Sequence, residues 1–383
     1  MLELNKVHNF ECLEGLKQLP DNYVDCCVTS PPYFGLRDYG TGTWVGGDPN
    51  CPHFRTNHFS KKCQTGHRNI IEMHGCSDSI YKKVCPKCGA VRIDQQVGLE
   101  ETPEEYVSRL TEIFREVRRV LKPEGTLWLN LGDSYVSKPK SNYDGKGESL
   151  NDKAYGTGDT TLGYKMQADK FKELLLTYKN KDLIGIPWQT AFALRADGWW
   201  LRQDIIWHKP NPMPEAIKDR CTKSHEYIFL MSKSAKYYFD YQAIQEPATS
   251  ADDLERRIRN GKELWKTNLA QTTYAVSGVG RDRRELYTKT ESGEYMRNKR
   301  DVWSVNTKPD TSAHFAVFPE DLIKPCILAG CPHDGIVLDP FMGSGTTGRV
   351  ATMLNRNFIG FELNPEYIKL CERKTKVTPD LFY

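Results

Sequence analysis

A glycine-rich turn near the carboxyl-terminal end of the chain has residue types suited to holding a nucleoside cofactor. An apolar run over 335–338 predicts a strand that leads through Asp339 into Gly343-Ser344-Gly345-Thr346. Glycines let a backbone approach a ligand closely, and the amino terminus of the helix expected after them favours an anion. The next expected strand ends in Glu362, whose carboxylate can accept hydrogen bonds from ribose hydroxyls. No lysine precedes Thr346, so this is not a P-loop, although a plain tight turn also fits the glycines alone.

A second segment, Ser30-Pro31-Pro32-Tyr33, follows a buried strand expected over 23–29. Two successive prolines cannot continue a hydrogen-bonded ladder, so the segment is predicted to be a loop at the end of that strand. Alone, the four residues also fit an ordinary loop. Their occurrence in one chain with the glycine-rich turn makes a functional loop the stronger interpretation.

The stretch 51–88 concentrates potential metal ligands. It holds five of the 12 cysteines and four of the nine histidines of the chain. Cys85-Pro86-Lys87-Cys88-Gly89 has the spacing at which two thiolates occupy two corners of a tetrahedral zinc site. No carboxylate base accompanies these residues, so the expected site is structural. Free thiols in a polar insertion are the alternative.

The elements that must position these segments alternate between strands and helices, which predicts an α/β fold. Besides those already given, we expect helices over 104–121, 187–196 and from 364 onward, and strands over 126–131, 199–207, 226–231 and 357–361. Pro123-Glu124-Gly125 is expected to be a turn. The predicted core stretches are 1–48, 96–135, 183–240 and 306–383, and the insertions are 49–95, 136–182 and 241–305.

The two motifs together resemble those of the β group of DNA amino-methyltransferases, in which the catalytic motif precedes the cofactor motif. The segments 126–135, 204–212, 223–233 and 313–329 also look like motifs of that family. The resemblance implies a doubly wound, mostly parallel sheet, the Rossmann-like methyltransferase fold in permuted motif order. It further implies methyl transfer from S-adenosylmethionine to an exocyclic amine of a base flipped out of duplex DNA.

By this resemblance, the Ser30 hydroxyl and the Pro31 carbonyl would accept the hydrogens of the target amine, and Tyr33 would stack on the base. Pro32 belongs to the same catalytic loop. Serine at the first position is typical of cytosine-N4 enzymes, whereas aspartate is typical of adenine-N6 enzymes. We therefore favour cytosine N4, with adenine N6 as the alternative.

The resemblance also assigns residues to the cofactor and to zinc. The expected cofactor residues are Asp339, Phe341, Gly343, Ser344, Gly345, Thr346 and Glu362, with Phe315 and Pro319 from the preceding segment. Related methyltransferases pair a Cys-x-His with a later Cys-x-x-Cys, so the expected zinc ligands are Cys51, His53, Cys85 and Cys88. Cys63, His74 and Cys76 are the competing residues.

The charge of the chain is uneven. The net charge is only +3 over 383 residues, yet 51–92 has eight Lys or Arg against two Asp or Glu, and 253–300 has 12 against seven. Such basic stretches suit phosphate contacts, and arginines also suit guanine edges. Region 241–305 lies where the β group has its target-recognition elements. The predicted DNA-binding residues are Arg281, Arg283 and Arg284.

The expected partner is double-stranded DNA, with a cognate restriction endonuclease acting separately. Mean hydropathy is −0.61 and no export signal or membrane-length apolar run is visible, so we expect a cytoplasmic protein of a prokaryote or phage. RNA or a protein amide is another substrate class that such loops serve. A non-catalytic, zinc-dependent DNA-binding protein is a different functional class, which the intact motifs oppose.

Overall fold

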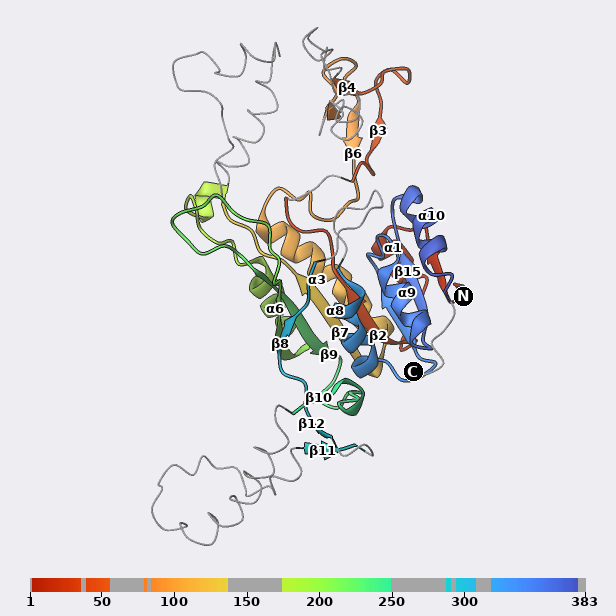
Figure 1. The fold of residues 1–383 in the computed structure, drawn as a ribbon. Helices are drawn as coiled ribbons and strands as arrows, with labels where there is room; N and C mark the ends of the chain where they lie inside the picture. The colour runs from red at the N-terminus through yellow and green to blue at the C-terminus, as the bar shows by residue number, and fades with distance from the viewer. Residues whose placement is uncertain are drawn as a thin grey trace, which may run out of the picture. The chain divides into compact units, whose positions relative to one another are not determined.

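The computed structural model describes residues 2–35, 39–55, 79–80, 84–136, 174–248, 287–290, 294–307 and 318–377 (Figure 1). The chain divides into two compact units. The first comprises Met1–Ser30, Arg115–Asn130 and Arg195–Tyr383, and the second comprises Pro31–Phe114 and Leu131–Leu194. Among the described residues, no helix has the length and apolar character needed to cross a bilayer.

The first unit is built on an eight-stranded sheet. In spatial order its strands are β1 (Lys6–His8), β15 (Asn357–Phe361), β14 (Ile336–Asp339), β2 (Val24–Thr29), β7 (Leu121–Leu131), β9 (His225–Ser232), β8 (Trp200–His208) and β13 (Val302–Ser304). The pairs from β1 to β7 are parallel, as is β8 with β13, while β8 and β9 are antiparallel. The expected mostly parallel sheet is confirmed.

Helices cover both faces of this sheet, as in a doubly wound fold. On β15, Phe361 and Phe358 point to opposite faces because they are three residues apart. Gly15 of α1 (Cys12–Lys17) packs against the ring of Phe361, and Gly348 of α9 (Thr346–Met353) packs against Phe358. On the α9 face, α8 (Glu320–Gly330) and α10 (Pro365–Lys374) complete the layer (Figure 1).

The main hydrophobic core fills the space between the sheet and the α8–α9 layer. Trp128 of β7 is 1% exposed and lies against Gly330, so α8 sits close to the sheet at this point. The cluster continues through apolar side chains of the strands and of both helices, among them Val28, Ile228, Val337, Ile327, Val350 and Phe358. This core holds β2 and β14 in register, and both strands lead into the loops that carry the two sequence motifs.

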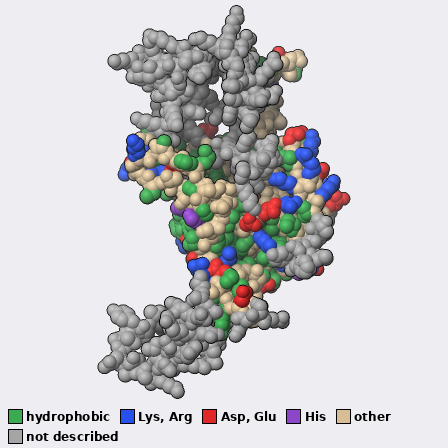
Figure 2. Space-filling view, in the orientation of Figure 1, with side chains coloured by type: hydrophobic (Ala, Val, Ile, Leu, Met, Phe, Trp, Pro, Cys, Tyr) green, Lys and Arg blue, Asp and Glu red, His purple; other side chains and the backbone are tan. Residues whose placement is uncertain are grey.

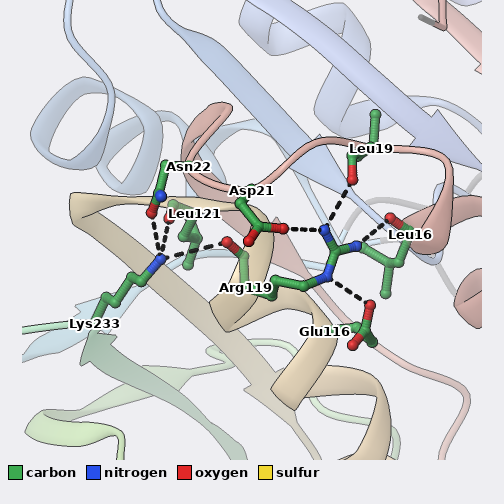
Figure 3. A network of polar contacts seen from close by, with 8 residues as sticks. All are labelled: Leu16, Leu19, Asp21, Asn22, Glu116, Arg119, Leu121 and Lys233. Carbon is green, nitrogen blue, oxygen red and sulfur yellow. Dashed lines mark hydrogen bonds and ion pairs between the residues drawn. The ribbon is translucent and has the colours of Figure 1, made fainter.

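At the amino-terminal edge of the sheet, one arginine connects two helices (Figure 3). Arg119, in the last turn of α3 (Pro103–Val120), donates to the carbonyls of Leu16 and Leu19 at 2.9 Å each. These carbonyls lie at the carboxyl-terminal end of α1, where helix carbonyls lack partners within the helix. Arg119 also pairs with Asp21 and Glu116, at 2.6 and 2.9 Å. The contacts fix the chain just before it enters β2.

The second unit contains two short antiparallel ribbons. One pairs β3 (Thr43–Val45) with β6 (Val91–Ile93), and the other pairs β4 (Phe54–Arg55) with β5 (Ser79–Ile80). The helix α6 (Ile186–Ala196) begins in this unit. A third small sheet, in the first unit, orders β10 (Glu246–Pro247), β12 (Tyr295–Arg297) and β11 (Tyr287–Lys289), after the short helix η2 (Gln242–Ile244).

Most expected elements are confirmed, and one is corrected. The structure has helices at Pro103–Val120 and Ile186–Ala196 and strands at Val24–Thr29 and Asn357–Phe361, close to the expected bounds. The expected turn at Pro123-Glu124-Gly125 is wrong, because β7 starts at Leu121. The pairing with β2 jumps from Val24↔Leu121 to Cys26↔Thr126, so these residues form a bulge inside the strand. The expectations did not include β1, α1 or α8.

Candidate functional site

The cofactor-motif loop is organised by the buried carboxylate of Asp339 at the end of β14. Asp339 is 1% exposed, and its Oδ1 accepts hydrogen bonds from the Thr29 hydroxyl at 2.6 Å and the Phe341 backbone N–H at 3.0 Å. Its Oδ2 accepts from the Thr347 hydroxyl at 2.5 Å. A carboxylate held this way ties together the strand end, the loop and the start of α9.

The loop itself requires glycine at two positions. Gly343 and Gly345 have φ of 57° and 89°, in the left-handed region that favours glycine. A Cβ at Gly345 would lie 3.0 Å from the Cα of Cys371. The Cys371 thiol donates to the Gly343 carbonyl at 3.1 Å, so α10 supports the loop. The backbone therefore turns tightly, and at position 345 it leaves little room for a side chain.

Glu362, directly after β15, is the second carboxylate of this loop. Its Oε2 accepts from the Gly343 backbone N–H at 2.9 Å and its Oε1 from the Asn364 backbone N–H at 2.7 Å. Burial disfavours the charged form and raises the pKa of Glu362 from 4.5 to about 7, and that of Asp339 from 3.8 to about 6. Glu362 is partly exposed and thus accessible to a ligand in the loop.

The strands that lead into the two sequence motifs are neighbours in the sheet of the first unit. β2 and β14 are parallel neighbours, with Cys27 paired to Leu338, so both end at the same edge. The Thr29–Asp339 hydrogen bond joins residues 310 positions apart in the chain. Ser30, half-buried, directly follows Thr29. The first residue of the catalytic motif is therefore beside the cofactor-motif loop.

Within the second unit, the rest of the catalytic motif, Pro31–Tyr33, is held by its backbone. The buried Tyr106 hydroxyl donates to the Pro32 carbonyl at 2.9 Å, and burial raises the pKa of Tyr106, which keeps this donor protonated. Among the described residues, none donates to the Pro31 carbonyl. The Tyr33 ring lies against Gly132, where a Cβ would be 2.5 Å from Cε2. The loop thus leaves one carbonyl available and orients one ring.

Four potential metal ligands converge in the second unit. The ligand atoms of Cys51, His53, Cys85 and Cys88 all lie within 4.8 Å of one another. The Sγ atoms of Cys51 and Cys85 are 3.7 Å apart, and Cys88 Sγ is 3.6 Å from His53 Nδ1. A tetrahedral zinc site has sulfurs about 3.8 Å apart and sulfur about 3.6 Å from nitrogen. The donor set therefore fits zinc.

The local backbone is shaped for this cluster. Gly89 has φ of 76° and its N–H donates to the Cys85 carbonyl at 2.8 Å, which forms the turn between the two cysteines. A Cβ at Gly47 would lie 2.8 Å from Cys88 Sγ. His53 has φ of 51°, uncommon for a residue other than glycine, and stacks on Trp44 with ring centroids 4.5 Å apart.

The remaining expected residues are distributed as follows. Ser344 and Thr346 are buried in the cofactor-motif loop, where Ser344 accepts from Lys374 at 2.9 Å, and Phe341 is half-buried. Pro319 is the buried N-cap residue of α8. Outside the described residues are Phe315, Arg281, Arg283 and Arg284, together with Cys63, His74 and Cys76.

Several residues that build the site were not predicted from the sequence. Thr29 and Thr347 were not singled out, although both hydroxyls bond Asp339, and neither were Gly132 and Tyr106. Threonine at a strand end gives no signal of its own. Gly132 did offer a signal: a glycine at the end of an apolar strand often marks a place where another group, here the Tyr33 ring, approaches the backbone closely.

Comparisons with known proteins agree with this arrangement. A family model described as DNA methylase, with N6 and N4 in its name, matches residues 24–373. The Type II methyltransferase M.Cfr9I of Citrobacter freundii is 38% identical over 371 residues, 96% of this chain and 87% of its own. M.SmaI of Serratia marcescens, also a Type II methyltransferase, is 36% identical over 361 residues, 94% of this chain and 87% of its own.

Among solved structures, PvuII DNA methyltransferase (cytosine-N4-specific) superposes with a TM-score of 0.50. The aligned residues are 15% identical and cover 96% of this chain and 87% of that one. At this identity the likeness concerns the fold, and it agrees with the parallel sheet described above.

Proposed function

This chain belongs to the N6/N4 family of DNA methylases, and on that premise we propose that it methylates the exocyclic N4 of a cytosine flipped out of duplex DNA. The methyl donor in this proposal is S-adenosylmethionine. The observation that carries it is the hydrogen bond between Thr29 and Asp339. It joins the strand that leads into Ser30 to the strand that leads into the glycine-rich loop, so Ser30 and this loop lie at one edge of the sheet.

The cofactor-motif loop would hold the donor through its backbone and through Glu362. Left-handed glycines at 343 and 345 let the loop turn tightly, so that its backbone can approach the cofactor closely. Glu362 retains lone pairs beyond its bonds to Gly343 and Asn364, and these suit ribose hydroxyls. Asp339 has three hydrogen bonds within the protein, so its role here is to set the loop conformation.

When bound, S-adenosylmethionine would supply a methyl group activated by the adjacent sulfonium. The new N–C bond would form as the C–S bond breaks, the sulfur would become a thioether, and the methylated amine would lose one proton to solvent. The chain must make the target nitrogen nucleophilic, because its lone pair is delocalised into the ring. The Ser30 hydroxyl and the Pro31 carbonyl accept the amino hydrogens, which favours a pyramidal nitrogen. Tyr106 engages the Pro32 carbonyl, so Pro31 is the adjacent carbonyl left for the amine.

Serine at position 30 supports cytosine N4 over adenine N6. Positioning and electrostatics supply the rate enhancement, without a covalent enzyme intermediate. Cys26 and Cys27 are buried beside the loop, and burial raises the pKa of both thiols well above the ordinary value. Such thiols are poor nucleophiles, which agrees with direct transfer.

Zinc is the metal proposed for Cys51, His53, Cys85 and Cys88. The support is the fit of the donor distances to a tetrahedral site and the absence of carboxylates from the set. All four corners are filled by protein atoms, which is the arrangement of a structural ion. The Type II relatives further suggest a restriction–modification role, with a separate endonuclease of the same specificity.

The test is transfer of tritiated methyl from S-adenosylmethionine to duplex DNA, followed by mass analysis of the nucleosides. N4-methylcytosine is the expected product. N6-methyladenine as the product would reject cytosine N4 as the target but support methyl transfer to DNA. The absence of label in any DNA would reject the proposed reaction. Label in RNA or protein in place of DNA would reject the substrate class.

A further inference from the structure

We infer that the Cys51–His53–Cys85–Cys88 centre positions the catalytic loop Pro31–Tyr33 through a path of hydrogen bonds that ends in a close backbone contact, all within the second unit. This inference rests on the proposed function, because it assigns the metal centre a part in that reaction. The residues that transmit the effect are Arg92, Asp94, Gln96 and Gly98. They contact neither the base nor the cofactor, so they are positioning residues.

The path starts at the metal ligands, which flank the β3–β6 ribbon. Cys51 and His53 follow β3, and Cys85 and Cys88 precede β6. The two strands pair directly, with Thr43 opposite Ile93 and Val45 opposite Val91. The Ala90 carbonyl, just before β6, accepts from the Cys85 N–H at 2.8 Å. A tetrahedral ion bound by these four ligands would therefore link the segments that adjoin both strands, at the same end of the ribbon.

At the other end of the ribbon, the Asp94 carboxylate joins both strands to the segment that follows. Its Oδ1 accepts from the Thr41 hydroxyl at 2.8 Å and the Gln96 backbone N–H at 3.1 Å. Its Oδ2 pairs with Arg92 at 2.6 Å, with side chains 3% and 10% exposed for Arg92 and Asp94. Since the pair is buried, removing one partner leaves an uncompensated charge, which should destabilise the junction strongly.

From this junction the chain passes directly onto the catalytic loop. Gln96 accepts from the Tyr39 N–H at 2.7 Å, which brings the chain after the loop to the same point. The Gly35 N–H donates to the Gly98 carbonyl at 2.8 Å. Gly98 has φ of 96°, and a Cβ there would lie 2.9 Å from the Tyr33 carbonyl oxygen. The backbone at Gly98 therefore packs closely against the backbone of Pro32 and Tyr33.

The functional consequence is that the metal affects methyl transfer without affecting the cofactor. The cofactor-motif loop belongs to the first unit, whereas the whole path from the metal ligands to Tyr33 lies in the second. Without the metal, the two strand ends at the ligands separate and the path loses its fixed end. Displacement of a reacting group by about 1 Å can lower a rate about a hundredfold. The chemical step should thus slow while cofactor affinity stays unchanged.

The experiment compares three forms of the full-length protein: zinc-loaded, zinc-free after chelation, and D94N. On each form we measure zinc content and, after cobalt substitution, cobalt–thiolate absorption. We also measure cofactor affinity, single-turnover methyl transfer and hydrogen exchange of 31–35. For the zinc-free form we expect faster exchange at 31–35 and transfer slowed about tenfold to a hundredfold, with cofactor affinity unchanged. Added zinc should restore both. D94N should keep its zinc and show the same two changes.

Controls separate the different ways in which the inference could fail. C221S removes an exposed cysteine outside the centre and should match the unaltered protein in every readout. Unchanged exchange and transfer in zinc-free protein, or no metal and no cobalt–thiolate absorption in the unaltered protein, would overturn the inference. If the unaltered protein methylates no DNA but exchange at 31–35 still depends on zinc, the proposed function fails while the coupling stands.

Discussion

At the scale of single residues, the site consists of carboxylates and carbonyls whose hydrogen bonds divide them into two groups. Asp339 is 1% exposed and accepts from Thr29, Thr347 and Phe341, so it organises the loop. Glu362 is partly exposed, and among the described residues none donates to the Pro31 carbonyl, so both are suited to ligands. All three positions were identified from the sequence. Their division into two groups was not, because burial and hydrogen-bond partners depend on the folded chain, as the Thr29–Asp339 bond across 310 positions shows.

Replacement of Tyr33 tests base stacking. We expect Y33A to slow single-turnover transfer about 5- to 150-fold, since stacking of one base on an aromatic ring contributes about 1–3 kcal/mol. Cofactor affinity should stay unchanged. Y33F keeps the ring and is the matched control, with a rate close to that of the unaltered protein. Equal rates for Y33A and Y33F would contradict a stacking role. Rapid-quench kinetics and equilibrium dialysis provide the two measurements.

The raised pKa of Glu362 predicts a pH-dependent contribution to stability. Burial raises this pKa from 4.5 to about 7, so the protonated form is favoured in the folded state. A group with a raised folded pKa contributes stability below its unfolded pKa, and loses it as pH rises to the folded value. This contribution should therefore disappear between about pH 4.5 and 7. Its size is at most about 3 kcal/mol, because the side chain is partly exposed.

The measurement is the thermal unfolding midpoint of the unaltered protein minus that of E362Q, over pH 4.5 to 8. Glutamine does not titrate, so the subtraction isolates Glu362 from the other carboxylates. We expect the difference to fall as pH rises through the window and to become flat above it. A difference independent of pH would show that Glu362 has an ordinary pKa in the folded protein.

At the scale of elements, the site is made by loops at the carboxyl-terminal ends of adjacent parallel strands. The β2–β14 pair matters most, since it brings Thr29 to Asp339. The same edge of an α/β sheet commonly binds ligands, because loops from neighbouring strands meet there. The bulge in β7 opposite Val24 lies at the opposite edge, where it leaves these loops undisturbed.

A conservative change at Thr29 tests this connection. T29V has the same shape but removes the hydroxyl and leaves Asp339 with one hydrogen bond fewer in a buried place. We expect a loss of about 1–3 kcal/mol in the free energy of unfolding, together with weaker cofactor binding. T29S retains the hydroxyl and should lose less of both. If T29V and T29S were equally stable in urea titrations, the hydrogen bond would contribute nothing.

Elements with strong periodicity and clear end signals could be predicted from the sequence, whereas elements without them could not. The helix α3 has an apolar stripe from Tyr106 to Val117 and a Thr-Pro start, so its bounds were close. The strand β1 has three residues and acquires its identity only by pairing with β15. Pro325 inside α8 disfavours a helix locally, but the core contacts of Leu322 and Ile327 stabilise the helix there. Both β1 and α8 therefore form because of contacts with other parts of the fold, which the local sequence does not reveal.

At the scale of the whole molecule, the small net charge conceals an uneven distribution. On the face in Figure 2, acidic and basic side chains are interspersed over the described residues. The excess positive charge of the sequence lies in 51–92 and 253–300, most of which is outside the described part of the chain. These two segments carry +6 and +5, so the rest of the chain has a net charge of −8. Basic segments on an acidic body suit a protein that binds DNA at limited places.

Substitution of Arg281, Arg283 and Arg284 by alanine tests whether the second basic segment binds DNA. We expect weaker DNA binding and unchanged cofactor affinity. If these arginines neutralise phosphates, the slope of log affinity against log salt should fall by about 0.9 for each arginine replaced. Arginines on guanine edges would instead relax sequence preference with little change in slope. Anisotropy titrations at several salt concentrations measure both, and unchanged DNA affinity would contradict the assignment.

The pairing of β1 with β15 also bears on the order in which a newly made chain can complete its sheet. Lys6 lies opposite Ile359, so the ribosome must synthesise roughly 350 further residues before β1 acquires its neighbour. At about 5–20 residues per second, β2 waits roughly 15–70 s for β14 and β15. The nascent chain therefore has Ser30 long before it has Gly343, Gly345 and Glu362. A chain released before these residues are made would therefore have the Ser30 motif without the glycine-rich loop.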